Sequence, residues 1–149
     1  MNLTYSFQNP RDLFEKMERD AAALDDCVTG DKAFNFVITA CHIRDWIMSS
    51  SDTQEIKDAL KTLTNNKSFQ LCRDLTNASK HMEITKYEPL AEDASSSQGF
   101  GVGRFGKGPC GIGEESIEIT HSDGSMIDIL QLKDEIVSLW SEFFSEHKI

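Results

Sequence analysis

Residues 10–82 limit the fold more than any other part of the sequence, because almost every signal in them is helical. After Pro10 this stretch holds one glycine, Gly30, and no proline. Apolar residues recur at spacings of three and four over residues 10–26 and 67–82 and at Ile56, Leu60 and Leu63, which is the period of an amphipathic helix. Over residues 33–48 they fall on nearly every side, as in a helix at the centre of a bundle. This half of the chain is therefore expected to form four helices.

Polar residues mark where these helices are expected to begin. Asn9 can cap the first helix, with Pro10 at the first helical position, where its missing N–H removes no helical hydrogen bond. Asp31 is expected to cap the second helix. Ser51 or Asp52 is expected to open the third helix within a capping box, in which a side chain three residues further on returns the hydrogen bond.

Residues 116–130 are expected to form a β-hairpin. The stretch SIEITHSDGSMIDI alternates with the two-residue period of a strand on either side of a turn. A three-residue turn with Gly124 in the left-handed conformation pairs Ile119 with Ile127. It also pairs Ile117 with Ile129, so that the isoleucines share one apolar face.

An amphipathic pattern over residues 132–143 predicts a helix at the end of the chain. Together, these signals predict a mainly α protein, a helical bundle of about five helices with one β-hairpin inserted before the C-terminal helix. A length of 149 residues suits one hydrophobic core. We therefore expect a single helical domain over residues 1–149.

Residues 84–113 join the fourth helix to the hairpin and are expected to form a flexible connection. The first part is rich in serine and acid, and the second, GFGVGRFGKGPCGIG, holds seven of the nine glycines. These glycines nearly match two phosphate-binding signatures, but both signatures need a strand before the loop and a helix after it. Neither flank fits, and Gly108 stands where the Walker motif requires a hydroxyl. We therefore expect no nucleotide site.

The glycine tract is also a small basic region in an acidic chain. It carries Arg104 and Lys107 and no acidic residue between positions 99 and 113. The fourth helix is a second basic region, with Lys67, Arg73 and Lys80. If the two regions meet, they could bind an anion or a stretch of RNA backbone.

Several polar side chains fall where the helices should be apolar. Asp45 lies inside the apolar stripe of the second helix, and His42 lies near its edge. The fourth helix carries a row of polar residues at spacings of three and four: Asp74, Asn77 and His81. We expect Asp45 to be buried and to pair with His81, Asn77 or Lys80. The resulting network either fixes the register of the helices or forms a site with His42.

At these residues the sequence resembles a known family. The segments FNFVITACHIRDWI and CRDLTNASKH, with Arg-Asp followed by a histidine on the same helix, are similar to the signature of HEPN domains over roughly residues 31–83. The resemblance implies a dimeric helical bundle of a toxin–antitoxin or phage-defence system that cuts RNA without metal. It also implies that Arg73 stabilises charge on the scissile phosphate, that Asp74 is the polar residue after it, and that His81 moves a proton.

The charge of the chain favours a different function. A net charge of −10 predicts solubility and repulsion from nucleic acid and from anionic membranes. It suits a non-catalytic acidic binding protein, such as an immunity protein, an antitoxin or a phage-encoded inhibitor, whose partner is a basic protein. RNA and a basic protein thus both stay open as partners. A small-molecule site beneath the glycine tract is a third hypothesis.

The remaining composition predicts location and chemistry. The four cysteines are widely spaced, which indicates free thiols in a reducing compartment. Neither a signal peptide nor an apolar run of the ~20 residues that span a bilayer is evident, so we expect a cytoplasmic protein without a membrane partner. The four histidines lie on separate elements, so no metal and no cofactor are expected.

Overall fold

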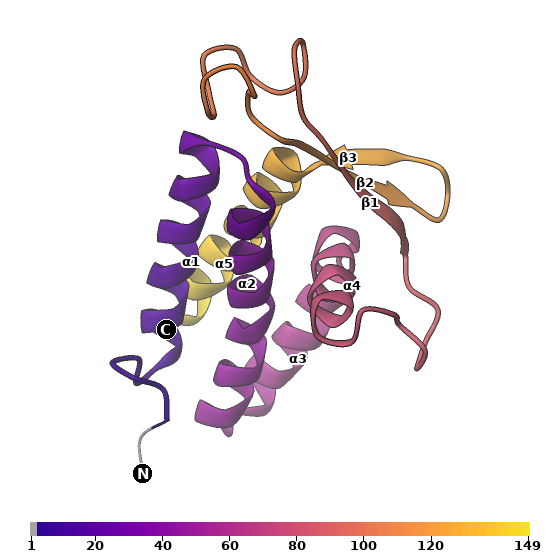
Figure 1. The fold of residues 1–149 in the computed structure, drawn as a ribbon. Helices are drawn as coiled ribbons and strands as arrows, with labels where there is room; N and C mark the ends of the chain where they lie inside the picture. Colours follow the sequence, from indigo (N-terminus) through magenta and orange to yellow (C-terminus); the bar gives the residue numbers. More distant parts are fainter. Residues whose placement is uncertain (1–2) are drawn as a thin grey trace.

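The computed structural model describes residues 3–149, which form five helices and a three-stranded antiparallel sheet (Figure 1). The mainly α fold expected from the sequence is confirmed. The helices are α1 (Pro10–Asp26), α2 (Gly30–Ser50), α3 (Gln54–Thr64), α4 (Lys67–His81) and α5 (Ile129–His147). The strands are β1 (Ala91–Ser97), β2 (Ser116–His121) and β3 (Met126–Asp128). Among the described residues, no helix is long and apolar enough to cross a bilayer.

The core lies between α1, α2, α4 and α5. In Figure 1, α1 and α2 run side by side in opposite directions, and α5 lies behind them. Trp140 of α5 is fully buried, and its indole N–H donates to the Ala40 carbonyl oxygen at 2.9 Å. Its ring meets those of Phe69, Phe143 and Phe144 edge to face. These contacts join the C-terminal helix to α2 and α4.

The helix starts partly match the expected caps. Asn9 caps α1, and a reciprocal bond with Asp12 completes a capping box. At α2, however, the cap is Thr29 and not Asp31, because the Thr29 hydroxyl already accepts the Lys32 N–H at 3.2 Å. The capping box expected at Ser51 or Asp52 is wrong, since α3 begins after Thr53 without a side-chain cap.

The buried face of α2 differs from the expected one. Asp45 is exposed and pairs with its neighbour Arg44 at 2.9 Å, so its predicted burial is wrong. Phe34 and Met48, which the apolar stripe around Asp45 was expected to include together with Val37, are 47% and 38% exposed. Val37 is buried as expected, and the buried residues of the helix are Ala33, Phe36, Val37, Thr39, Ala40, Ile43 and Ile47. Because α2 is apolar nearly all round, its neighbours decide which face is buried.

The hairpin forms with the expected turn. Ile119 lies opposite Ile127, and Gly124 has a φ of 85°, as the three-residue turn requires. Ile129 does not pair with Ile117, because the Asp128 carboxylate accepts the Leu130 N–H at 2.7 Å and starts α5 there.

The connection expected over residues 84–113 contains a strand that the sequence did not predict. β1 pairs with β2 and becomes the edge of the sheet, with Ala94 opposite Ile119 and Ser96 opposite Ile117. Its sequence, AEDASSS, lacks the alternating apolar residues that identify a half-buried strand. Residues 91–97 of the expected connection therefore form a strand, while its flexibility stays a prediction.

Candidate functional site

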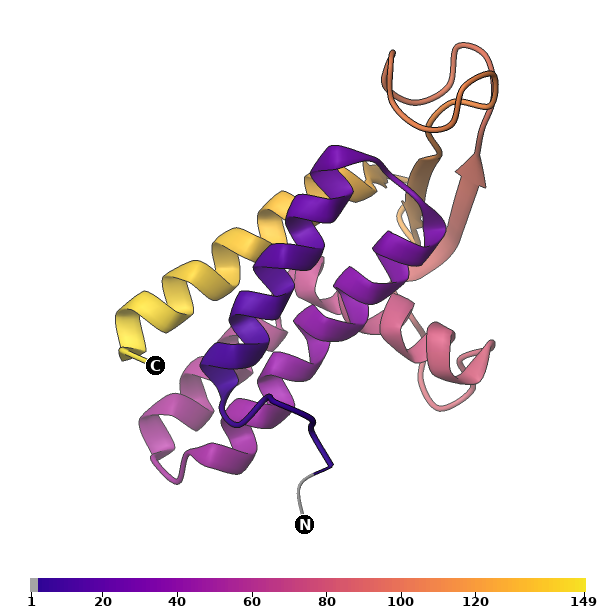
Figure 2. The same ribbon diagram turned by 60° about the vertical axis from the view of Figure 1, so that its left-hand side comes forward.

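The glycine loop, residues 99–113, stands away from the helices at the end of the sheet between β1 and β2 (Figure 2). It is built from consecutive turns. Backbone bonds join Val102 N to Gly99 O at 3.1 Å and Gly113 N to Pro109 O at 2.9 Å. All seven glycines of the loop have positive φ. The glycines therefore allow backbone conformations that other residues adopt only at an energetic cost. The sequence was interpreted as a flexible segment, and these defined turns were not foreseen. The mobility of the loop stays a prediction.

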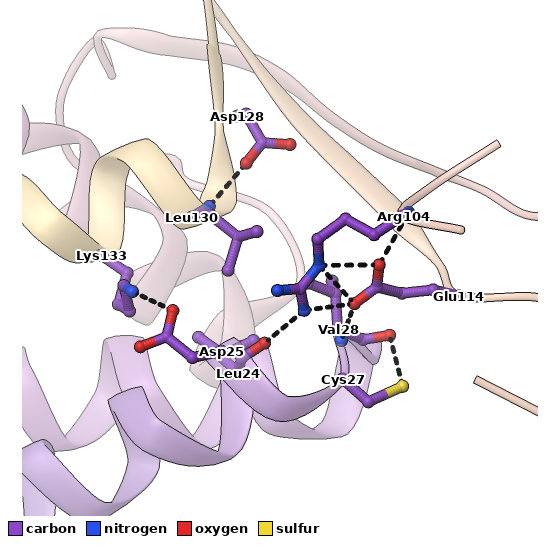
Figure 3. A network of polar contacts seen from close by, with 9 residues as sticks. All are labelled: Leu24, Asp25, Cys27, Val28, Arg104, Glu114, Asp128, Leu130 and Lys133. Atoms are coloured by element: carbon purple, nitrogen blue, oxygen red, sulfur yellow. Dashed lines mark hydrogen bonds and ion pairs between the residues drawn. The ribbon is translucent and has the colours of Figure 1, made fainter. Parts of the chain in front are cut away.

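An ion pair between a half-exposed Arg104 and a buried Glu114 holds the base of this loop against the helices (Figure 3). The Glu114 side chain is 1% exposed. It accepts from the Arg104 guanidinium at 2.6 Å and from the Arg104 backbone N–H at 2.8 Å. The Glu114 carboxylate also accepts the Val28 N–H at 2.7 Å, and Arg104 donates to the Leu24 carbonyl oxygen at 3.3 Å. One pair therefore joins the loop to the turn between α1 and α2.

The electrostatics of this ion pair follow from its geometry. The Arg104 guanidinium and the backbone N–H groups of Val28 and Arg104 lower the pKa of Glu114 to about 2, despite the opposing effect of burial. Leu24 O and Val28 N lie where α1 ends and α2 has not begun, so the helices leave them without partners of their own. The pair thus replaces hydrogen bonds that water would otherwise supply.

Two glycines in the loop allow close approach to the backbone that follows it. A Cβ at Gly103 would lie 2.6 Å from the Glu114 carbonyl oxygen, and one at Gly108 would lie 2.4 Å from that of Gly113. A Cβ at Gly106 would meet nothing within 4 Å, although its φ of 75° is similar to the 73° of Gly103.

Gly103→Ala is therefore expected to destabilise the protein more than Gly106→Ala. Both variants carry the strain of a left-handed residue, about 1–2 kcal/mol, but only Gly103→Ala also displaces the Glu114 backbone. Urea unfolding of the two variants measures the difference. Equal losses would mean that the loop moves freely enough to absorb the added Cβ.

The outer part of the glycine loop is apolar and exposed. Phe100 and Phe105 are fully exposed, and Ile112 is 53% exposed. The loop encloses a hollow of about 560 Å³ lined only by its own residues. Asp26 at the end of α1 and Asp31 in the first turn of α2 are exposed, and in the sequence they flank Val28, whose N–H binds Glu114. The loop thus exposes two aromatic rings and the cation Lys107.

A second polar group lies on α4 and was partly expected from the sequence. Asp74 is 1% exposed. Its carboxyl group accepts the Tyr87 hydroxyl at 2.7 Å and the N–H groups of Leu90 and Ala91 at 2.7 and 3.1 Å. Asn77 donates to the same Tyr87 oxygen at 2.8 Å. Asp74 therefore holds the chain between α4 and β1.

Arg73 and His81 lie at different ends of this group. The Arg73 guanidinium lies 4.8 Å from the centre of the Tyr87 ring. The Nε of Arg73 is buried and has no hydrogen-bond partner among the described residues. His81 is exposed and shares with Asn77 a hollow of about 430 Å³, which Lys86 and Tyr87 also line. Arg73 and His81 are eight residues apart on α4, which separates their α carbons by ~12 Å along the helix axis.

The other predicted contacts do not form. The Asp45 carboxylate pairs with Arg44 instead of His81, Asn77 or Lys80, and Lys80 is exposed. His42 is exposed and lines a separate hollow with the N-terminal segment, over residues 3–7. Cations of the two basic regions bind other groups: Arg104 binds Glu114, and Lys67 binds Asp123. Arg73 contacts the Tyr87 ring and pairs with Asp74 at 3.5 Å.

Sequence reasoning missed the residues that give the glycine loop its form. Glu114 directly follows the tract and was the available signal, since an acid next to a tract with two cations can pair with one of them. Phe100 and Phe105 were visible but were read only as part of a flexible segment. Within residues 3–149 no group of three or more histidine, cysteine or acidic side chains is arranged to bind a metal. Comparison with protein families, curated proteins and solved structures finds no match to this chain.

Proposed function

We propose that the protein is a non-catalytic binding protein of the cytoplasm that presents its glycine loop to a protein partner. The observation that carries this proposal is the pair of fully exposed phenylalanines, Phe100 and Phe105, on a loop whose base is held by the Arg104–Glu114 ion pair. Exposed aromatic side chains are unfavourable in water and are enriched at the centres of protein interfaces.

The Arg104–Glu114 pair supports a binding role because it orders the loop in advance. A loop that is disordered before binding loses conformational entropy when a partner fixes it, and that loss weakens binding. Here the backbone N–H of Arg104 and its side chain both bind Glu114, so the base of the loop is already fixed. Phe100 and Phe105 are then available to an apolar pocket at a smaller entropic cost.

The charge of the protein indicates what surrounds that pocket. The net charge is −10, and Asp26 and Asp31 are exposed on either side, in the sequence, of Val28, whose N–H binds Glu114. A partner with basic residues around an apolar pocket would match both features and would associate faster at low salt. This chemistry is that of the target of an immunity protein, an antitoxin or a phage-encoded inhibitor.

The test compares a loop variant with a matched surface variant. Phe100→Ser with Phe105→Ser is expected to retain the Tm and to lose a partner that the wild type captures from the native host, because neither ring contributes to the core. Phe34→Ser with Met48→Ser removes partly exposed apolar residues from α2 and is expected to keep the partner. Binding of the purified partner should show the same order.

Three results would contradict this function. The loop variant could keep the partner, the captured protein could be lost after nuclease treatment, or the wild type could bind neutral lipid vesicles through Phe100 and Phe105. The last result would assign the loop to a membrane surface.

A second function is favoured by the α4 group. Arg73, Asn77, His81 and Lys86 gather around the Tyr87 segment, as an RNA-directed HEPN-like protein would need. RNA cleavage by the wild type, abolished in His81→Ala at unchanged Tm, would support this function over the first. Because Arg73 and His81 are ~12 Å apart along the helix, one chain alone would not bring both side chains to the same phosphate group.

A further inference from the structure

β1 is a strand that contributes almost nothing to the core. Its seven residues, AEDASSS, are exposed except for Ala91, which is half-buried. A strand in a small sheet is usually held by burying alternate side chains on one face. β1 has no such face, so the burial of apolar side chains does not explain why this strand is ordered.

Two carboxylates at the ends of β1 hold it in place instead. At its start, the buried Asp74 binds the N–H groups of Leu90 and Ala91. Near its end, the Glu115 carboxylate accepts the Ser96 hydroxyl at 3.0 Å and the Gly30 N–H at 2.9 Å. Side chains from α4 and from the residue before β2 thus fix a segment that packs little itself.

The outer edge of β1 is open. The sheet order is β1-β2-β3, and in Figure 2 the strand forms the border of the sheet. Alternate residues of an edge strand direct their N–H and C=O groups away from the sheet, and proteins commonly protect such edges with charged side chains, above all lysine, with proline or with a β-bulge. The register of β1 shifts between Ala91 and Asp93, so its regular edge runs over residues 93–97. β1 contains no lysine or proline, and there is no lysine or arginine between residues 87 and 103. Its charged side chains are Glu92 and Asp93, both exposed.

We propose that β1 is the template on which the partner adds an extended, basic segment as a fourth strand. This inference rests on the proposed function and specifies how the same partner would be bound. The edge would supply backbone hydrogen bonds, and Glu92 and Asp93 would select lysine or arginine. β1 leads directly into the glycine loop, with Ser97 three residues before Phe100, so one partner can contact both.

The charge argues against a second copy of this chain as the occupant. Each copy carries a net charge of −10 and brings Glu92 and Asp93 to the shared edge, so like charges would approach one another. A basic strand meets no such repulsion. Self-association through β1 is therefore an outcome that the test can detect.

The experiment uses a capped peptide of alternating lysine and valine, KVKVKVK, as the probe. Binding is expected to shift the amide resonances of residues 91–97 and to slow hydrogen exchange at the outward-facing N–H groups. The same peptide with N-methyl groups on its inner residues keeps the charge but loses the backbone donors. It is expected to bind about tenfold more weakly, which corresponds to about 1.4 kcal/mol.

Ala94→Pro and Ser95→Pro form a matched pair, because adjacent residues of a strand direct their N–H groups to opposite edges. The proline whose N–H faced outward is expected to retain the Tm and to weaken peptide binding about tenfold. The proline whose N–H faced β2 is expected to remove a backbone hydrogen bond to β2 and to lower the Tm.

The inference is overturned if both peptides bind equally with shifts spread over α1 and α2, if neither binds, or if the protein dimerises through β1. Partner capture separates it from the proposed function. If the outward proline variant keeps the partner and the Phe100→Ser, Phe105→Ser variant loses it, strand addition fails and the loop function stands. If the loop variant keeps the partner, the proposed function itself fails.

Discussion

Replacing Asp74 with alanine is expected to lower the free energy of unfolding by about 3–5 kcal/mol. The Asp74 carboxyl group is buried and accepts from Tyr87, Leu90 and Ala91. The substitution leaves two backbone N–H groups and a hydroxyl without their acceptor, and a buried unsatisfied donor costs about 1–3 kcal/mol. It also releases the segment that connects α4 to β1.

Tyr87→Phe is the matched control for this prediction. It removes one of the three donors and leaves both backbone bonds in place, so a loss of about 1 kcal/mol is expected. Urea unfolding measures the stabilities, and hydrogen exchange shows whether residues 82–97 become less protected. The double variant should be less destabilised than the sum, because both changes remove the same hydrogen bond.

An unchanged stability in Asp74→Ala would contradict this structural role. If RNA binding or cleavage were lost at the same time, Asp74 would belong to a functional site, as the resemblance to HEPN domains implies. The structure favours the structural role, because Asp74 accepts hydrogen bonds from Tyr87, Leu90 and Ala91, all in the chain that follows α4. Arg73 of α4 also pairs with the Asp74 carboxylate, at 3.5 Å.

The parts of the fold that were predicted correctly depend on short-range physics. The start of α1 follows from Asn9 and Pro10, which act within one helical turn. The pairing of Ile119 with Ile127 follows from the turn geometry at Gly124 and the two-residue period of strands. In each case the residues that decide the structure are neighbours in the sequence.

The wrong predictions concern choices made by distant residues. Asp45 was placed in the core because α2 offers apolar residues on nearly every side, and the periodicity alone does not select one. Trp140 contributes to the selection by binding the Ala40 carbonyl oxygen from α5. β1 was missed because its order depends on β2, on Asp74 and on Glu115 rather than on its own side chains.

The candidate site shows the same limit. Arg104 was expected to be a free cation for an anion or RNA, whereas the structure pairs it with Glu114 and with the Leu24 carbonyl oxygen. The first contact lies ten residues away and was within reach of sequence reasoning. The second lies eighty residues away and depends on where the end of α1 meets the loop.

Glu114→Gln is expected to lower the free energy of unfolding at neutral pH by about 2–3 kcal/mol. The pKa of Glu114 is lowered from 4.5 to about 2, and each pKa unit corresponds to about 1.4 kcal/mol. The expected loss lies below the full conversion, because the Arg104 side chain is 38% exposed and water screens part of the attraction. Glu115→Gln is the matched control, since Glu115 binds Gly30 and Ser96 without a cation.

The pH dependence gives this prediction its second measurement. A carboxyl group whose pKa is lowered by folding stabilises the protein above its unfolded pKa, and loses that contribution as the pH falls through its folded value. The stability difference between wild type and Glu114→Gln should therefore be constant above pH ~4.5 and shrink as the pH falls to about 2. A difference that does not change over this range would mean that the charge of Glu114 is not what holds the loop.

Hydrogen exchange should locate the effect of Glu114→Gln. Loss of protection is expected at Arg104 and Val28, whose N–H groups bind the Glu114 carboxylate, while the amides of α4 stay protected. The rings of Phe100 and Phe105 would then lie on a loop with a mobile base. The variant should therefore also bind the partner more weakly, mainly through faster dissociation. Full binding by a Glu114→Gln protein with an unprotected loop would show that prior ordering of the loop does not contribute to recognition.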